Sequence, residues 1–116
     1  MFRSAKNYLQ HILLEMDFIL ENSQDLTQDD FFKDERLKRA FVRSLEVIGE
    51  ASKNLSNDFR SNNPQIPWRR MAGMRDKLIH EYFGVDYDVV WDVISHQIPI
   101  LRYEIRVLID GLSDAE

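Results

Sequence analysis

Apolar residues recur at helical spacing in four stretches of the chain. In residues 2–19 they follow one another at intervals of three or four, as on one face of an α-helix. The same pattern returns in residues 37–55, 67–82 and 90–112. Apolar and polar residues alternate nowhere over a useful length, so the pattern predicts helices and no sheet.

Polar and turn-forming residues separate these stretches. Residues 22–25 end the first periodic stretch, and residues 57–67 are the clearest loop because they contain Asn62-Asn63-Pro64. Pro67 suits the first turn of the third helix, and Gly84 suits its end. We therefore expect an all-α, up-and-down four-helix bundle that forms a single domain over residues 1–116.

The fourth helix carries a proline within its apolar stripe. Pro99 has no N–H to donate to the carbonyl of Ser95, so we expect a kink or a break near this point. The helix also has a second apolar arc, which is wide enough for burial on two sides. We therefore predict a homodimer built on the third and fourth helices. The residues of this arc are Val89, Val93, Ile100 and Val107.

Composition and charge limit the classes of function. The 116 residues carry a net charge of −5 and include no cysteine. The negative net charge argues against binding to nucleic acid by overall charge, and the absence of cysteine excludes thiolate metal sites and disulfides. No apolar run approaches the roughly 20 residues of a membrane span, and the N-terminus does not resemble a signal peptide. A cytoplasmic protein that does not bind membranes is expected.

The third helix concentrates the chemically useful side chains. On a regular helix Arg75 and Tyr82 share one face with core residues, while Asp76 and His80 share a second face with Gly73. Asp76 precedes His80 by four residues, so its carboxylate could orient the imidazole. Gly73 leaves room there for a ligand or another backbone. The remaining face is expected to point to solvent and holds Arg70, Met74, Lys77 and Glu81.

Simpler structural interpretations apply to each of these residues. A histidine at a helix end commonly lies at the surface, which is the interpretation we adopt for His11 and His96. A buried arginine is often an ion-pair partner, and Tyr82 could simply pack its ring on the helix. Arg75 and His80 also lie about 140° apart on a regular helix. They can share a substrate only if the arginine wraps round, the helix end distorts, or a second subunit completes the site.

Acidic residues of the second helix have two interpretations. Glu46 and Glu50 follow Arg39 and Arg43 at spacings of three and four, which is typical of a solvent-exposed ladder of salt bridges. Alternatively, Gly49 lets another helix approach closely, and Glu50 then anchors an arginine of the third helix.

Several blocks of the sequence resemble the HepT-like proteins of the HEPN superfamily. Residues 67–86 contain the pattern Arg-x4-His-x-Tyr at Arg75, His80 and Tyr82. Residues 44–51, Trp91 and Ile98-Pro99 match further parts of the family. The position after the arginine is often Asn in the family and is Asp76 here. An anion there could slow cleavage beside a phosphate, or it could orient His80.

The resemblance implies a metal-independent ribonuclease toxin without a cofactor. His80 would transfer the proton during attack of a ribose 2′-OH, and Arg75 would hold the phosphate, supported by Asp76, Gly73 and Glu50. HEPN proteins usually dimerise with two motifs facing one cleft. The partner antitoxin of the family is a minimal nucleotidyltransferase, which transfers AMP to the motif tyrosine, here Tyr82.

Two other classes of protein fit the same sequence. One is a non-catalytic adaptor that binds substrate beside a nucleotidyltransferase, and the acidic composition suits such a protein partner. The other is a purely structural helical dimer. Loss of RNA cleavage in a His80→Ala variant would separate the enzyme from both.

Overall fold

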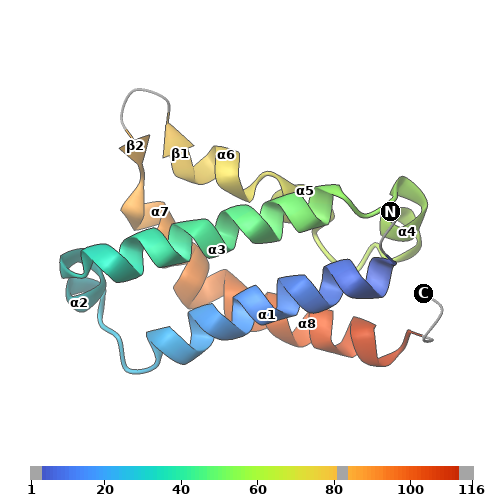
Figure 1. Cartoon of the computed structure of the whole chain (residues 1–116), viewed down its shortest axis with the longest axis horizontal. Helices are drawn as coiled ribbons and strands as arrows, with labels where there is room; N and C mark the ends of the chain where they lie inside the picture. The colour runs from blue at the N-terminus through green and yellow to red at the C-terminus, as the bar shows by residue number, and fades with distance from the viewer. Residues whose placement is uncertain (1–3, 81–83, 113–116) are drawn as a thin grey trace.

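The chain forms a bundle in which successive long helical segments run in opposite directions (Figure 1). The computed structural model describes residues 4–80 and 84–112, apart from the side chains of residues 79 and 80. The all-α bundle predicted from the sequence is confirmed, although two of its four members are interrupted. The four members are α1 (Ala5–Ser23); α3 (Glu35–Lys53); α5 (Trp68–Ala72) with α6 (Met74–Leu78); and α7 (Tyr87–Asp92) with η1 (Val93–Gln97) and α8 (Ile98–Asp110).

Side-chain caps mark where several helices begin. In each case a serine, threonine or aspartate accepts a hydrogen bond from the backbone N–H three residues later, which satisfies a donor that the first helical turn leaves free. These capping residues lie directly before α1, α2, α3, α4 and α7, and they are Ser4, Thr27, Asp34, Ser56 and Asp86.

The core lies between α1, α3 and the last helical segment. α1 packs against both α3 and α8, and α3 also packs against α5 and α6. The apolar stripes read from the sequence are the buried faces, and burying one such side chain stabilises the fold by about 1.5–3 kcal/mol. The fully buried residues of α1 and α3 include Leu9, Ile12, Met16, Ile19, Phe41, Leu45 and Ile48.

Aromatic residues join a short helix to this core. The helix α2 (Gln28–Lys33) was not predicted, because only two apolar residues mark it. Its Phe31 is fully buried and stacks on Phe41 with ring centroids 5.8 Å apart. The same ring lies 5.4 Å from that of Trp91 in α7. α2 is therefore held by tertiary packing rather than by its own periodicity.

The fourth member of the bundle changes helical type before its proline. η1 is a π-helical turn, and the N–H of Ile98 donates to the carbonyl of Val93, five residues earlier. Pro99 then occupies the first turn of α8, where its missing N–H is not needed. The predicted break near Ser95 is confirmed, and its form is a widened turn.

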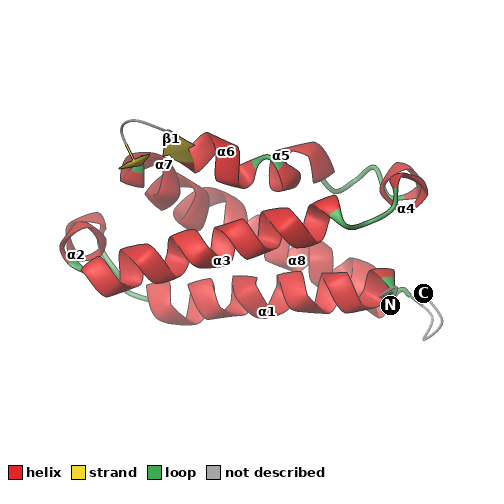
Figure 2. Cartoon of the chain, turned by 45° about the horizontal axis from the view of Figure 1, so that its top comes forward, coloured by secondary structure: helices red, strands yellow, loops and turns green. Residues whose placement is uncertain are grey.

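The middle of the chain differs from the prediction. The helix α4 (Asn57–Asn62) lies within the expected loop of residues 57–67 and sits at one end of the bundle (Figure 2). The third helix divides at Gly73 and ends at Leu78, so the predicted continuation to residue 82 is wrong.

A short antiparallel ladder follows the end of α6. β1 (Ile79–His80) pairs with β2 (Gly84–Val85), with Ile79 opposite Val85 and His80 opposite Gly84. Gly84 has a φ of 74°, which glycine adopts readily. The expectation of no sheet therefore fails at this point, and Gly84 contributes to the ladder instead of ending a helix.

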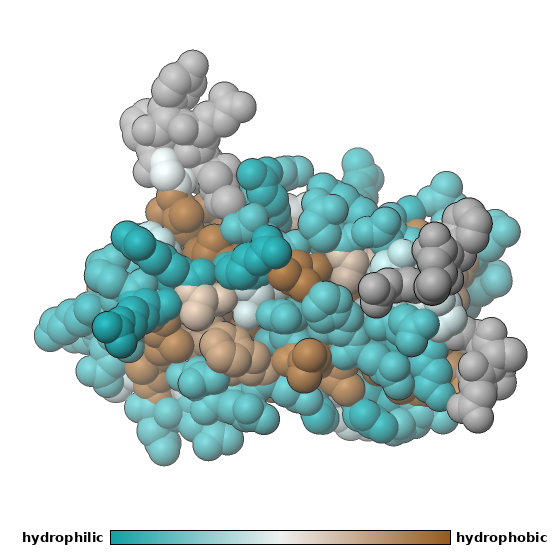
Figure 3. Space-filling view, in the orientation of Figure 1, coloured by the Kyte–Doolittle hydropathy of each residue, from teal (hydrophilic) through white to brown (hydrophobic). Residues whose placement is uncertain are grey.

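The surface over α1 and α3 has both hydrophilic and apolar parts (Figure 3). Arg102 of α8 donates from Nε to Oδ1 of Asp17 in α1 at 2.8 Å, and this hydrogen bond raises the pKa of the arginine.

A groove of about 580 Å³ lies between α1 and α3, lined in part by Leu14 and Phe18. Among the described residues, none of the helices combines the length and the apolar character of a transmembrane segment.

Candidate active site

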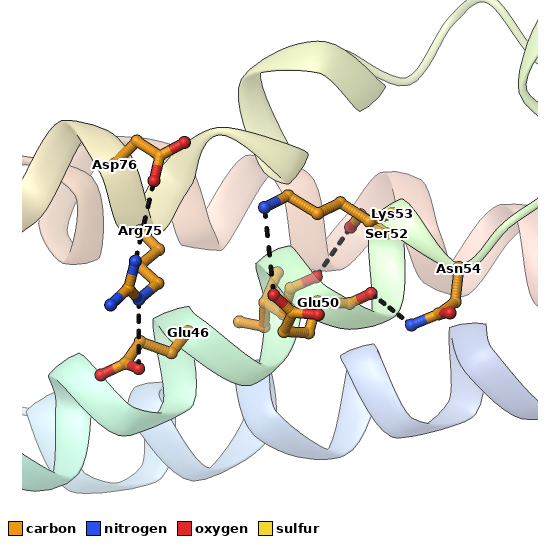
Figure 4. A network of polar contacts seen from close by, with 8 residues as sticks. Glu46, Glu50, Ser52, Lys53, Asn54, Arg75 and Asp76 are labelled. Carbon is orange, nitrogen blue, oxygen red and sulfur yellow. Dashed lines mark hydrogen bonds and ion pairs between the residues drawn. The ribbon is translucent and has the colours of Figure 1, made fainter.

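Arg75 extends from α6 toward α3, and its guanidinium lies between two carboxylates (Figure 4). Its Nε is 3.6 Å from Oε2 of Glu46, and its Nη1 is 3.9 Å from Oδ1 of Asp76. The side chain is 49% exposed, whereas Met74 and Leu78 of the same helix are buried. α6 thus anchors itself through apolar residues and leaves the arginine accessible at the surface.

α3 and α5 approach one another closely at Gly49. A Cβ atom at this position would lie 3.3 Å from the carbonyl oxygen of Met71 and 3.4 Å from that of Ala72. Most side chains need more room than this, so glycine permits the observed spacing. The expectation that Gly49 admits another helix is confirmed.

Glu50 does not anchor an arginine of the third helical segment. Its side chain is 65% exposed and lies 3.9 Å from Nζ of Lys53, on the same helix. The carboxylate that reaches Arg75 belongs to Glu46, one turn earlier. The reason is direction: α3 runs opposite to α5 and α6, so the residue level with Arg75 precedes Gly49 in α3.

His80 lies beyond the helix, in β1. The contact that we expected between Asp76 and His80 assumed a helix through both residues, and α6 ends at Leu78. Asp76 lies near Arg75, and its side chain is 73% exposed. The angular separation of about 140° between Arg75 and His80 also assumed a regular helix. Arg75 and His80 could share a substrate in three ways, and one of them is a distortion of the helix end. The structure shows such a distortion, because α6 ends at Leu78 and β1 follows it.

Two further predicted site residues are Gly73 and Tyr82. The close neighbour of a Cβ built on Gly73 would be the carbonyl oxygen of Arg69 at 3.3 Å, in the preceding helical turn. Tyr82 lies outside the described residues, as does Glu81, the expected partner of Lys77.

The expected solvent face is only partly exposed. Arg70 and Lys77 are exposed as predicted, but Met74 is buried. The physical reason is that α6 packs against both α3 and α7, so Met74 is enclosed. His11 and His96 are surface residues, as expected, and they lie near Glu15 and Asp92 on their own helices.

The sequence predicts Glu46 only in a solvent-exposed ladder of salt bridges, whereas the structure brings it to Arg75. Glu46 precedes Gly49 by three residues, so both lie on one side of α3. A glycine marking close helix approach, with an acid one turn away, was the available signal. Among the described residues no group of three or more histidine or carboxylate side chains could hold a metal ion.

Comparison with known families bears on the identity of this site. The model of the family "Ribonuclease HepT-like" matches residues 12–108. The chain belongs to the HepT-like ribonuclease family. In this HepT-like chain the matched span includes every predicted site residue, from Glu50 to Tyr82.

Three relatives of this HepT-like chain match it over nearly their whole length. A candidate RNase of Caldanaerobacter subterraneus is 49% identical over 92% of this chain and 96% of its own. The "Probable ribonuclease HepT" of Thermococcus cleftensis is 49% identical over 88% and 93%. A candidate RNase of Methanocaldococcus jannaschii is 45% identical over 95% and 91%. No solved structure gave a significant match.

Proposed function

We propose that this protein is a metal-independent endoribonuclease and the toxin of a toxin–antitoxin pair. The observation that carries the proposal is the accessible guanidinium of Arg75, positioned by α3 and five residues before His80, in a chain of the HepT-like ribonuclease family. The protein would act in the cytoplasm, where its RNA substrate is found.

The proposed reaction uses the substrate's own ribose as nucleophile. The 2′-oxygen forms a bond to the adjacent phosphorus, and the bond from phosphorus to the 5′-oxygen breaks. His80 transfers the proton of the 2′-hydroxyl, which ends on the departing 5′-oxygen, because an imidazole titrates near neutral pH. Arg75 stabilises the additional negative charge on the phosphorane through charge-assisted hydrogen bonds. The products are a 2′,3′-cyclic phosphate and a 5′-hydroxyl.

A homodimer would bring two such sites to one cleft. An exposed apolar stripe on α8 supports this part of the proposal. Ile100, Tyr103 and Val107 are spaced by three and four residues, and they are 60%, 69% and 54% exposed. Such a stripe on a helix is suited to burial by a second subunit. Sedimentation of the protein as a monomer at micromolar concentration would contradict a shared cleft.

We also propose that a minimal nucleotidyltransferase neutralises the toxin by transferring AMP to Tyr82. Tyr82 follows His80 by two residues, as in the family motif. AMP on its phenol would place a negative phosphodiester and a nucleoside near Arg75, where both oppose RNA binding. Intact-mass spectrometry after coexpression tests this. Wild type should gain the mass of one or more AMP groups, whereas Tyr82→Phe should gain none and keep much of its cleavage activity.

A second candidate is a non-catalytic adaptor that binds substrate for the nucleotidyltransferase. The observation that favours it is the pair of carboxylates beside Arg75, since Glu46 and Asp76 compete with an RNA phosphate for the guanidinium.

Incubating purified protein with total bacterial RNA separates the two candidates. The enzyme predicts cleavage by wild type that persists in EDTA and disappears in His80→Ala. Activity that EDTA removes and Mg²⁺ restores would contradict the mechanism. Intact RNA with wild-type protein would favour the adaptor. Expressing the same two proteins alone in bacteria should reproduce the difference in growth and RNA integrity.

A further inference from the structure

Glu46 and Arg75 form a contact between two elements that are distant in the sequence. The carboxylate comes from α3 and the guanidinium from α6, and Oε2 lies 3.6 Å from Nε (Figure 4). The side chain of Glu46 is only 27% exposed, whereas that of Asp76, the other carboxylate near this arginine, is 73% exposed. Solvent therefore screens the charge of Glu46 less, and its effect on Arg75 is the stronger of the two.

The spacing of the helices makes this contact possible. Gly49 brings the backbone of α3 against the carbonyl groups of Met71 and Ala72. The two segments run antiparallel, so one turn back along α3 corresponds to one turn forward from Ala72. Glu46 thereby comes level with Arg75. Gly49 and Glu46 therefore act together. Gly49 allows α3 and α5 to approach closely, and Glu46 contacts Arg75.

The geometry leaves part of the guanidinium available. Glu46 lies closest to Nε, at 3.6 Å, and Asp76 lies closest to Nη1, at 3.9 Å. Both distances exceed a hydrogen bond, so the carboxylates restrict the arginine without saturating its donors. A free arginine side chain would have to lose much of its rotamer entropy to grip a phosphate. A restricted one has lost part of it already.

We infer that Glu46 is a positioning residue for RNA cleavage, which orients Arg75 so that its N–H donors meet the phosphate undergoing attack. This role rests on the proposed ribonuclease function. A positioning role should affect kcat and KM differently. Removing the charge of Glu46 takes an anion away from the substrate phosphate, so KM should stay the same or fall. The loss of orientation should lower kcat, because the interaction matters most in the transition state.

The test compares Glu46→Gln with Glu15→Gln in steady-state cleavage of a short RNA. Glu15 is a matched control: it is 22% exposed and lies 3.7 Å from His11 on α1, which does not carry the site. We expect kcat to fall by roughly 10- to 100-fold in Glu46→Gln, the range for a misplaced catalytic group. KM should not rise, and Glu15→Gln should match wild type. Equal kcat in the two variants, or a raised KM with kcat unchanged, would overturn the inference.

Two further measurements exclude a merely structural role. Glu46→Asp keeps the charge on a shorter stem, so it should retain more kcat than Glu46→Gln, with thermal melts alike for all variants. Equal loss in both, together with lowered melting temperatures, would mean that Glu46 only stabilises the fold.

Nuclear magnetic resonance tests the contact without relying on activity. The Nε–H signal of Arg75, assigned with an Arg75→Lys variant, should shift or broaden in Glu46→Gln and not in Glu15→Gln. An unchanged signal would overturn the inference. If wild type cleaves no RNA but the signal changes, the contact stands and the proposed ribonuclease function fails, and the catalytic role of Glu46 fails with it.

Discussion

The three long helices and the short elements between residues 57 and 85 hold their places by different means. α1, α3 and α8 each bury a series of apolar residues along one face. In contrast, α4 buries none of its residues, and α5 and α6 bury two each. A helix of about five residues is not stable alone in water. The short helices α5 and α6, which pack against α3, therefore depend on that packing for their position.

This difference explains where the site residues are. Arg75 lies on a short helix, and His80 lies in the ladder that follows it. The position of Arg75 is set by the packing of α5 and α6 on α3, at Gly49 and Glu46, and a continuous helix does not link it to His80. A site built in this way can lose activity without unfolding, while the long helices can lose stability through residues that never contact the substrate.

The largest expected effect is on activity. Arg75→Ala should reduce RNA cleavage at least 100-fold, the lower end of what one catalytic group usually contributes. The melting temperature should stay within a few degrees of wild type, because the side chain is half exposed and fills no core position. Gel assays of cleavage and circular dichroism melts measure the two quantities. Full cleavage by this variant would remove Arg75 from the site.

For the long helices we expect the opposite result, with the main effect on stability and not on activity. Phe41→Ala should lower the free energy of unfolding by about 3–5 kcal/mol, because it removes a fully buried ring that stacks on Phe31. Leu14→Ala is the control, since Leu14 is 65% exposed and should change stability little. Urea unfolding followed by circular dichroism gives both values. Equal stability of the two variants would show that the aromatic packing is not important.

Gly49 lies where α3 meets α5, so a substitution there should change both stability and cleavage activity. In Gly49→Ala, the higher helix propensity of alanine contributes about 1 kcal/mol, and overpacking against α5 costs about 1–3 kcal/mol. The net destabilisation should be about 0–2 kcal/mol, with cleavage reduced because α5 and α6 must shift.

Gly111→Ala is the matched control for that substitution. A Cβ at Gly111 would lie 3.6 Å from its nearest neighbour, an ordinary contact. Cleavage by this variant should equal that of wild type. If the two alanine variants have the same activity, the close approach at Gly49 does not position the site.

The smallest expected effect concerns the ion pair between the long helices. Asp17→Asn removes the charge that Arg102 contacts, yet both side chains are more than one-third exposed. Such pairs contribute about 0–1 kcal/mol, and salt screens them. Urea unfolding at low and high salt should therefore differ little between this variant and wild type. A loss of several kcal/mol would mean that charge, and not apolar burial, joins α1 to α8.

The elements that the sequence predicted correctly are those with long apolar stripes. α1 and α3 match the expected helices to within a few residues, and Pro99 correctly marked an interruption of the last one. α2 was missed because a single buried ring, Phe31, holds it. α4 was missed because its capping serine and polar residues carry no apolar period. Periodicity reports burial only where several turns share one face.

The sequence alone determined the helical class, the four apolar stripes and the motif that marks a HepT-like chain. These features are local, since they depend on spacing along the chain and on residue type. Tertiary structure decided that the third helix ends at Leu78 and that Glu46, not Glu50, reaches Arg75. The second outcome depends on how deeply α5 and α6 dock against α3. That depth is set at Gly49 by carbonyl groups more than twenty residues away, and no local pattern records such a contact.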